Sequence, residues 1–233
     1  MERPDVVYRL RPSRRNEELR YSLRSLANLP HGRVWTVGTT RPAWLAESVG
    51  HVVSPERPGT KWKNIVAALQ GACAAAEVSA TFVLIDDDMF VMQPLEEMPV
   101  LHRGPLEGVP SYNGTSTYHR GIRETEDLLH ELGRTDLLSY EVHLPIPITK
   151  ARMWEALAIA QAKRPKIRCL HARTLYGNLW RIGGALAVDC KAFGRAYEYR
   201  DRPFISTSDS SFVNQPVGKY VRASLPDPCI YER

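Results

Sequence analysis

Three consecutive aspartates follow an apolar stretch in the first half of the chain. Residues 82–95 read FVLIDDDMFVMQPL, so Asp86, Asp87 and Asp88 come directly after a run typical of a buried strand. Alternate residues at the end of a strand point the same way, which predicts that Asp86 and Asp88 project together. Carboxylate oxygens favour Mg²⁺ or Mn²⁺, which often bind one or two carboxylates together with substrate phosphates. Asp86 and Asp88 are therefore candidate metal ligands, and the alternative is an acidic turn without a ligand.

Around these aspartates the sequence alternates between strand and helix patterns. A β-α-β-β-α-β order is typical of a doubly wound sheet, in which ligands bind at the carboxyl ends of the parallel strands. The aspartates lie at such an end. The fingerprints GxGxxG and GxxxxGK followed by Ser or Thr are both absent, which disfavours dinucleotide oxidoreductases and P-loop enzymes. The predicted strands cover residues 5–10, 33–38, 51–54 and 81–86, and the predicted helices cover 16–29 and 61–76.

The second half of the chain is less regular, and no linker separates it from the first. We therefore predict an α/β fold, a single compact domain with a mostly parallel sheet and helices on both faces, in which residues 1–98 and 99–233 share one core. The second half is expected to contain helices over 124–132 and 150–163, a proline-stiffened extended segment over 141–147, short strands and turns over 165–189, and an ordered tail over 200–233.

Composition is that of a globular protein, with 43% hydrophobic and 24% charged residues among 233. The net charge of +5 fits an anionic ligand such as a nucleotide diphosphate, and also nucleic acid, and basic residues cluster at Arg9, Arg11, Arg14 and Arg15. The four cysteines form no CxxC pair, which predicts reduced thiols in a cytoplasmic protein. The charged start and the lack of a long apolar run predict no signal peptide and no membrane insertion.

Four sequence blocks, in order, resemble the Stealth family of sugar-1-phosphate transferases. The aspartate block FVLIDDDMFVMQPL is one of them, although Asp86 stands where the family has Asn, and RLRPSRRN replaces the family's TWVDGSD. In these departures the chain resembles short glycosyltransferase-like proteins encoded by actinobacterial phages and prophages. Both groups imply a GT-A (Rossmann-like) fold, with a nucleotide-sugar over the sheet beside an acidic metal motif. The other blocks are DVVY at 5–8 with RRNEELRYSLRSL at 14–26, RVWTV at 33–37 and PAWL at 42–45; YEVHLPIPITKARMWEAL at 140–157; and FISTSDSSF at 204–212 with LPDPCIYE at 225–232.

The resemblance implies that residues 1–98 bind the nucleotide-sugar and that residues 99–233 bind the acceptor. Arg20 and Arg24 lie four apart on one helix face and could bind the diphosphate, or they could form a solvated face. Lys61 and Asn64 sit near a helix N-terminus, where main-chain N–H groups attract anions. The predicted nucleotide-sugar site comprises Asp5, Arg20, Arg24, Lys61, Asn64 and Asp87.

Candidate catalytic and acceptor-binding residues come from the second half. His143 matches the family's His-x-Pro block, which implies a general base on an acceptor hydroxyl or a hydrogen bond to the transferred group. Arg173 could neutralise the leaving diphosphate. Asp209 could be a second metal ligand or an acceptor base, and the alternative is a helix cap. His119 and Arg120 could line the acceptor site.

These observations predict a metal-dependent glycosyltransferase that uses Mn²⁺ or Mg²⁺ and a nucleoside diphosphate-sugar, with a UDP-sugar as the expected donor. We expect a phage-encoded protein in the host cytoplasm, with a modified DNA, a virion protein or a glycan as acceptor. One alternative is a Stealth-like sugar-1-phosphate transferase. The other is a non-catalytic nucleic-acid-binding or assembly protein, in which the aspartates are structural.

Overall fold

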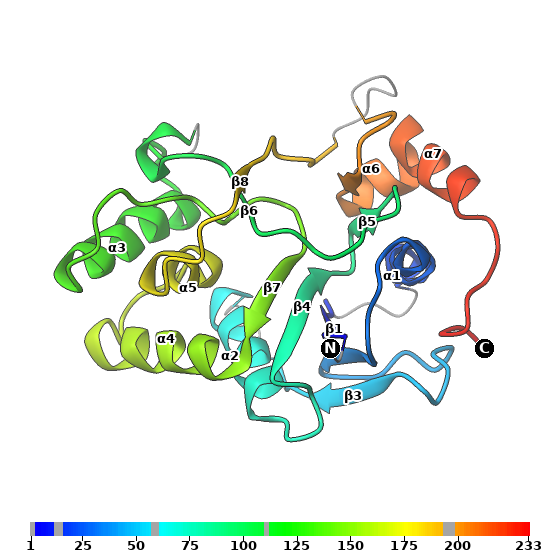
Figure 1. Cartoon of the computed structure of the whole chain (residues 1–233), viewed down its shortest axis with the longest axis horizontal. Coiled ribbons are helices and arrows are strands. Elements are labelled where there is room, and N and C mark those ends of the chain that lie inside the picture. Colours follow the sequence, from blue (N-terminus) through cyan, green and yellow to red (C-terminus); the bar gives the residue numbers. More distant parts are fainter. Residues whose placement is uncertain (1–2, 12–15, 57–60, 110–111, 193–198) are drawn as a thin grey trace.

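A computed structural model of the chain describes residues 3–11, 16–56, 61–109, 112–192 and 199–233. A five-stranded sheet with the strand order β3-β2-β1-β4-β7 forms its centre (Figure 1). The first four strands in that order run parallel, and β7 pairs antiparallel with β4 at the edge. The predicted mostly parallel sheet is therefore confirmed. The strands are β1 (Asp5–Arg9), β2 (Val34–Gly38), β3 (Gly50–Val53), β4 (Thr81–Asp86) and β7 (Ile146–Thr149).

The strands bury side chains on both faces of the sheet because apolar residues fill odd and even positions alike. On β1, Val6 and Tyr8 pack into one core with Val83 of β4, while Val7 packs into the other core with Leu84. Helix α1 (Glu17–Ser25) and the short 3₁₀ helix η1 (Leu26–Asn28) cover the first face. The second face is covered by α2 (Lys61–Ala74), α4 (Lys150–Lys163) and α5 (Ala172–Leu179), with α3 (Thr117–Glu131) packed on α5. Helices on both faces, as predicted, are confirmed (Figure 1).

The core joins the two halves of the sequence. Leu84 from the first half and Ile146 and Leu175 from the second lie in the same hydrophobic cluster, and β7 of the second half completes the sheet. The chain is thus a single α/β domain. The assignment of residues 1–98 to the donor and 99–233 to the acceptor stays a prediction.

Among the described residues beyond the aspartates, four short strands, a 3₁₀ helix and a helical pair lie outside the central sheet. Strand β5 (Met89–Val91) pairs antiparallel with β9 (Phe204–Ser206), and Phe90 of β5 stacks on Phe212 at 5.9 Å between ring centroids. Phe212 belongs to α6 (Asp209–Asn214), which packs on α7 (Pro216–Ser224). Strands β6 (Leu101–His102) and β8 (Ala185–Leu186) form a parallel ribbon, and η2 (Leu106–Gly108) follows β6.

Several predicted elements of the second half differ from the observed ones. The helix expected from residue 124 begins at Thr117, because the Ser116 side chain accepts a hydrogen bond from the amide of His119. The segment 165–189, expected to hold strands and turns, contains α5, whose eight residues are all buried. A helix buried all round shows no amphipathic period, which explains why the pattern missed it. The extended segment 141–147 becomes a strand only from Ile146 onward.

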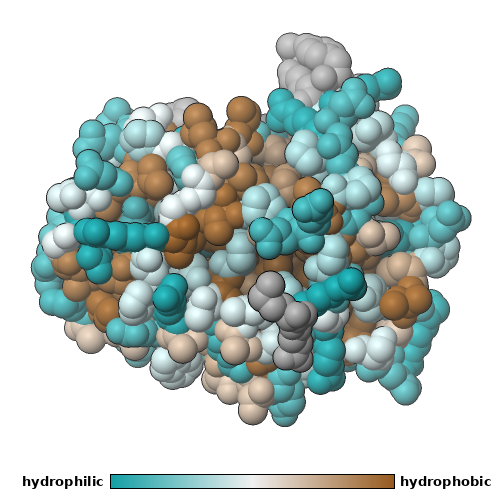
Figure 2. All heavy atoms as spheres, viewed as in Figure 1, coloured by the Kyte–Doolittle hydropathy of each residue, from teal (hydrophilic) through white to brown (hydrophobic). Residues whose placement is uncertain are grey.

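No helix among the described residues is both long and apolar enough to cross a bilayer. The face in Figure 2 is mixed, with hydrophobic side chains gathered at its upper middle, over β6 and β8. On β8 and just after it, Leu186 and Val188 are among the exposed large hydrophobic residues.

Candidate functional site

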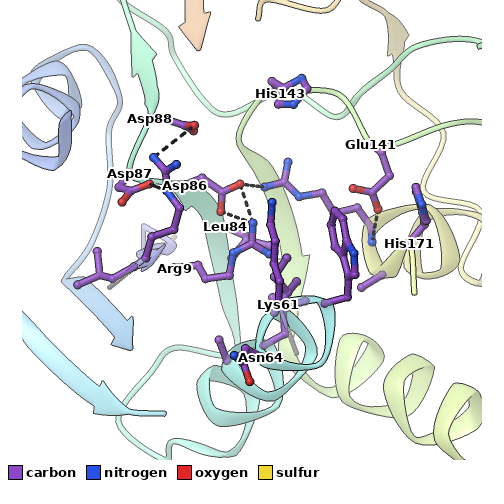
Figure 3. A pocket seen from close by; sticks show the side chains of 18 of the residues that line it. Arg9, Lys61, Asn64, Leu84, Asp86, Asp87, Asp88, Glu141, His143 and His171 are labelled. Atoms are coloured by element: carbon purple, nitrogen blue, oxygen red, sulfur yellow. Dashed lines mark hydrogen bonds and ion pairs between the residues drawn. The ribbon is translucent and has the colours of Figure 1, made fainter. Parts of the chain in front are cut away.

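A cleft opens at the carboxyl ends of β1, β2 and β4, as expected for a doubly wound sheet. Its volume is about 650 Å³, and both halves of the chain line it. In Figure 3 the three aspartates lie on one side, Glu141 and His171 on the other, and Lys61 and Asn64 below. The predicted residues that the structure brings together here are Lys61, Asn64, Asp86, Asp87, Asp88, His143 and Arg173.

Asp86 is the last residue of β4, and its carboxylate forms ion pairs with two arginines. Its register partner across the sheet is Arg9, whose Nη2 donates to Oδ2 at 2.9 Å, and Nη2 of Arg173 lies 3.5 Å from the same oxygen. Burial alone would raise the pKa of Asp86, but Arg9 and Arg173 lower it below its ordinary value. Asp86 is therefore an ionised anchor for two guanidinium groups.

Asp87 and Asp88 lie in the turn after β4 and share a different cation. Arg11 places Nε 3.3 Å from Oδ1 of Asp87 and Nη2 3.7 Å from Oδ2 of Asp88. Lys191 adds a contact of 2.9 Å between its Nζ and Oδ2 of Asp88. Burial raises the pKa of Asp87 to about 6, against the opposing effect of Arg11 and together with the nearby charges of Asp88 and Asp86. These two carboxylates form a pair that converges on one positive group.

Asp86 and Asp88 both line the cleft but have different cationic partners, and their predicted role as metal ligands stays a prediction. The strand ends at Asp86 and the chain turns at the next residue, so the alternation expected of a longer strand does not reach Asp88. Asp86 faces Arg9 and Arg173, whereas Asp88 faces Arg11 and Lys191.

Asp87 and Asp88 are the residues that fit a divalent cation. Their oxygens converge on a group with positive charge, and hard carboxylate oxygens suit Mg²⁺ and Mn²⁺. Within the described ranges no set of three His, Cys, Asp or Glu side chains is placed to hold a metal ion. A cation bound to these two carboxylates would therefore take its other ligands from substrate phosphates and water, as Mg²⁺ often does.

Arg11 connects this pair to two more acidic residues. Its Nη1 lies 2.8 Å from Oδ1 of Asp209, and its Nη2 lies 3.2 Å from Oε2 of Glu18. Asp209 is exposed at the start of α6, next to the capping residue Ser208, so it sits at the rim and reaches the aspartates through Arg11. Its predicted role as a metal ligand or base stays a prediction.

Arg173 is a buried cation, and one nitrogen of its guanidinium group makes no hydrogen bond to the described residues. It is 6% exposed, and its Nη1 donates to the carbonyls of Val142 at 3.3 Å and Leu144 at 2.7 Å. Its Nη2 has no hydrogen-bond partner among the described residues and lies at the longer distance of 3.5 Å from Asp86. Buried donors without a partner are rare in proteins, so this atom marks a place where a ligand oxygen would fit.

Lys61 supplies a further cation to the cleft. It is the first residue of α2, and Figure 3 shows its side chain extending from the helix toward Asp86. Its ammonium lies 4.8 Å from the centroid of the Trp62 ring. Trp62 in turn packs 5.7 Å from Tyr118, centroid to centroid, and both rings line the cleft. An aromatic wall next to cationic groups is suited to a ligand with a flat or ring-shaped part and a phosphate.

The far wall contains acidic and imidazole groups that sequence analysis did not identify. Glu141 accepts the backbone N–H of Arg173 at 3.2 Å and so caps the start of α5. His171 is buried, its Nε2 lies 3.0 Å from the carbonyl of Tyr118, and its ring packs 4.5 Å from that of Tyr118. Each is a lone residue in the sequence, without a partner at a recognisable spacing.

His143 stands in the wall above the aspartates, with its side chain 41% exposed (Figure 3). Its Nδ1 lies 2.8 Å from Oδ1 of Asp189, and the other oxygen of Asp189 lies 3.1 Å from Nη1 of Arg103. Asp189 and Arg103 are also missing from the sequence-based site.

Asp5 lies outside the cleft, so its predicted place in the nucleotide-sugar site is corrected. It begins β1, at the end of the strand opposite to Asp86, and is 6% exposed. Its carboxylate accepts the N–H of Arg33 at 2.8 Å, the indole N–H of Trp35 at 2.9 Å and the N–H of Ser79 at 3.0 Å. The side chain thereby fastens the strand ends together.

Arg20 and Arg24 also lie away from the cleft, and their predicted diphosphate contact is corrected. Both bind Glu232, Arg20 through Nη1 at 2.9 Å and Arg24 through Nε at 2.7 Å, and Arg20 covers the Trp44 ring at 4.0 Å. The helix face that carries them turns toward the end of the chain. Two blocks of the family resemblance, the first and the last, thus meet in a structural clamp, which consists of Arg20, Arg24, Trp44 and Glu232.

His119 and Arg120 are not part of the cleft lining either. His119 lies in the first turn of α3 with its ring edge-on to Tyr118 at 5.9 Å, and Arg120 is exposed. Tyr118, one position earlier on the helix, is the residue of this segment that lines the cleft. Arg9 and Arg11, by contrast, line the cleft and belong to the basic cluster that the sequence shows, although they were not predicted as site residues. Arg14 and Arg15 of that cluster lie outside the described residues.

A scan against protein-family models gives no match, and a search of curated proteins gives none either. Among solved structures, an active-site mutant of the glycosyltransferase LgtC is similar over 97% of this chain and 98% of that chain, with a TM-score of 0.51 and 11% identity. The glycosyltransferase GlyE of Streptococcus pneumoniae TIGR4 covers 97% of this chain and 50% of its own, with a TM-score of 0.41 and 10% identity. The chain therefore has a fold similar to that of LgtC over 97% of its length, and the resemblance to the Stealth family stays a prediction.

Proposed function

We propose that the chain is a glycosyltransferase that moves a sugar from a nucleoside diphosphate-sugar to an acceptor hydroxyl. The observation that carries the proposal is a group of three cations on one side of the cleft, where Arg9 and Arg173 contact Asp86 and Lys61 extends toward it (Figure 3). Around Asp86 three cations face one carboxylate, while the described lining of the cleft as a whole holds as many acidic as basic side chains. A diphosphate carries negative charge that these three cations can bind, and guanidinium groups bind phosphate oxygens in a fixed geometry.

The two arginines are preorganised for this role. Asp86 holds both guanidinium groups, and the carbonyls of Val142 and Leu144 orient Arg173 further. Nη2 of Arg173, which forms an ion pair of 3.5 Å with Asp86 but no hydrogen bond with the described residues, would donate to a phosphate oxygen. Donors that are already in place stabilise the charge that develops on a leaving diphosphate without any cost of rearrangement.

Asp87 and Asp88 are the residues that would hold Mn²⁺ or Mg²⁺. A bound cation would supply additional charge neutralisation to the diphosphate. Because Arg11 contacts both carboxylates, it would have to yield part of these contacts to an arriving cation. The dependence on metal is proposed from this carboxylate pair.

The proposed chemical step is a substitution at the anomeric carbon. The acceptor oxygen forms a bond to that carbon, the bond from the carbon to the diphosphate oxygen breaks with its electrons leaving on the nucleotide, and the hydroxyl proton passes to His143. Lys61, Arg9 and Arg173 stabilise the departing charge. The UDP-sugar donor, the phage origin and the acceptor, whether DNA, virion protein or glycan, stay predictions.

The released nucleotide tests this function. We expect that the purified protein, incubated with a panel of nucleotide-sugars and Mn²⁺, releases nucleoside diphosphate from one of them, by slow hydrolysis if no acceptor is present. Release should fall to background with a chelator and in Asp88→Asn. Asp127→Asn, on the exposed face of α3, is the matched control.

The nature of the product separates the alternatives. Release of nucleoside monophosphate instead of diphosphate would show sugar-1-phosphate transfer and reject the proposal. Failure of every donor, with and without Mn²⁺, would favour the non-catalytic alternative.

A further inference from the structure

We propose that Asp189 is a positioning residue that holds His143 in the one tautomer able to take a proton from the acceptor. The inference rests on the proposed function and deepens it, because it names the group that prepares the base. It is carried by a chain of contacts among Arg103, Asp189 and His143 at the wall of the cleft.

The ribbon of β6 and β8 brings these residues together. The two strands pair in parallel, with Leu101 opposite Ala185, so the segments that follow each strand run side by side. Arg103 follows β6, with its backbone N–H bonded to the carbonyl of Ser139 at 2.8 Å. Asp189 follows β8, and its Oδ2 lies 3.1 Å from Nη1 of Arg103. The carboxylate is therefore held by a cation on the side away from His143.

Asp189 then fixes the proton on the imidazole. Burial opposes its ionisation, but the hydrogen bonds of His143 and of the Lys191 N–H, together with Arg103, lower the pKa of Asp189 to about 2. A carboxylate that stays ionised is an acceptor only, so the 2.8 Å contact requires a proton on Nδ1 of His143. The Sγ of Cys190 also donates to the carbonyl of His143 at 2.7 Å, which holds the backbone at the same place.

The consequence is an acceptor nitrogen on a side chain that lines the cleft. With Nδ1 protonated, the neutral ring carries its lone pair on Nε2, the atom that a general base uses. A free imidazole prefers the opposite tautomer, with the proton on Nε2, in which that atom can only donate. When the acceptor proton arrives at Nε2, the ring becomes a cation, and Asp189 stabilises it, as in other pairs of histidine and carboxylate.

The tautomer and the turnover test the inference together. Selective ¹⁵N labelling of histidine reports which ring nitrogen of His143 is protonated, without substrate or metal, and His143→Gln assigns the signal. We expect protonated Nδ1 in the wild type and protonated Nε2 in Asp189→Ala. We also expect that the turnover number of Asp189→Ala falls by about 10²-fold or more while the KM for the donor changes little.

Two further variants guard against a trivial result. Asp189→Asn keeps the size of the side chain and an acceptor oxygen without the charge, so it should show a mixture of tautomers and intermediate turnover. Asp127→Ala, an exposed aspartate on α3, should match the wild type in both measurements.

Each outcome has a separate meaning. If Nδ1 keeps its proton in Asp189→Ala, or if that variant turns over the donor at the wild-type rate, the inference is wrong and the transferase function stands. If the wild type turns over no donor at all, the proposed function and this role fall together, and the spectrum reports a structural hydrogen bond only.

Discussion

Replacement of Arg173 by Gln should reduce kcat/KM for the nucleotide-sugar by about 10²- to 10³-fold, the range seen when one preorganised donor to a developing charge is removed. The side chain is buried, and its Nη2, which makes no hydrogen bond within the described residues, is the donor that we assign to the diphosphate. Binding of the nucleoside diphosphate should weaken as well, by about tenfold or more, because charged hydrogen bonds contribute about 1.5–3 kcal/mol. Steady-state kinetics and calorimetric titration measure the two effects.

The same substitution removes the hydrogen bonds to the carbonyls of Val142 and Leu144, so some loss of stability is expected in addition. Arg173→Lys keeps the positive charge but lacks the planar guanidinium group with its paired N–H donors. It should retain more diphosphate binding than Arg173→Gln. Arg152→Gln is a matched control, since Arg152 lies on α4 over the Trp180 ring, outside the cleft lining. A folded Arg173→Gln protein with wild-type affinity for nucleoside diphosphate would contradict the assignment.

Replacement of Glu232 by Gln should lower the free energy of unfolding by about 3 kcal/mol and the melting temperature by about 6–12 °C. The Glu232 side chain is 3% exposed and binds Arg20, Arg24 and the N–H of Cys229. Without its charge, two partly buried guanidinium groups lose their counter-ion. Nucleotide binding should stay unchanged, because the clamp lies outside the cleft.

The clamp also predicts how stability depends on pH. Burial opposes ionisation of Glu232, but hydrogen bonds from Arg24 and Arg20 lower its pKa from 4.5 to about 2. A carboxylate with a lowered pKa in the folded state contributes stability above its unfolded pKa, and this contribution is lost as the pH falls from about 4.5 to about 2. Glu232→Gln should therefore show a smaller loss of stability over this range than the wild type.

Glu47→Gln provides the comparison for both measurements. Glu47 is bound to Arg233 at 2.7 Å, but its side chain is 90% exposed, and exposed ion pairs contribute about 0–1 kcal/mol. Thermal melts of the two variants at neutral pH show whether the ion pairs of Glu232 stabilise the fold more than the exposed ion pair of Glu47 does. Equal melting temperatures for Glu232→Gln and Glu47→Gln would show that the clamp does not stabilise the fold.

The fold could be predicted from the sequence where local patterns and tertiary packing agree. The four parallel strands were predicted to within one residue at most ends, and Lys150–Lys163 forms a helix with the predicted limits. The pattern failed at α5, because a helix buried on every side has no polar face to reveal its period. It failed again for α6 and α7 in the tail, where the helices are short.

The candidate site was predicted in part, for a physical reason that differs from residue to residue. The position of Asp86 at a strand end is a local property, so it could be predicted from the apolar run that precedes it. The partners of Asp86 are not local: Arg9 reaches it through strand register, and Arg173 reaches it through the packing of α5. The same holds for Asp189, which meets His143 only because β6 and β8 pair. Arg20 and Arg24 have the chemistry of a phosphate site, but their helix face turns toward Glu232.

Calorimetric titration of nucleoside diphosphates tests the central claim most directly, which is that the cations around Asp86 bind a diphosphate. Lys61 faces the cleft, while Lys63, two residues later on α2, is exposed and outside its lining. The account predicts that one nucleoside diphosphate binds the wild type and Lys63→Gln with equal affinity, and that it binds Lys61→Gln about tenfold more weakly. Equal affinity for Lys61→Gln and Lys63→Gln, or no binding of any nucleoside diphosphate to the wild type with Mn²⁺ present, would contradict it.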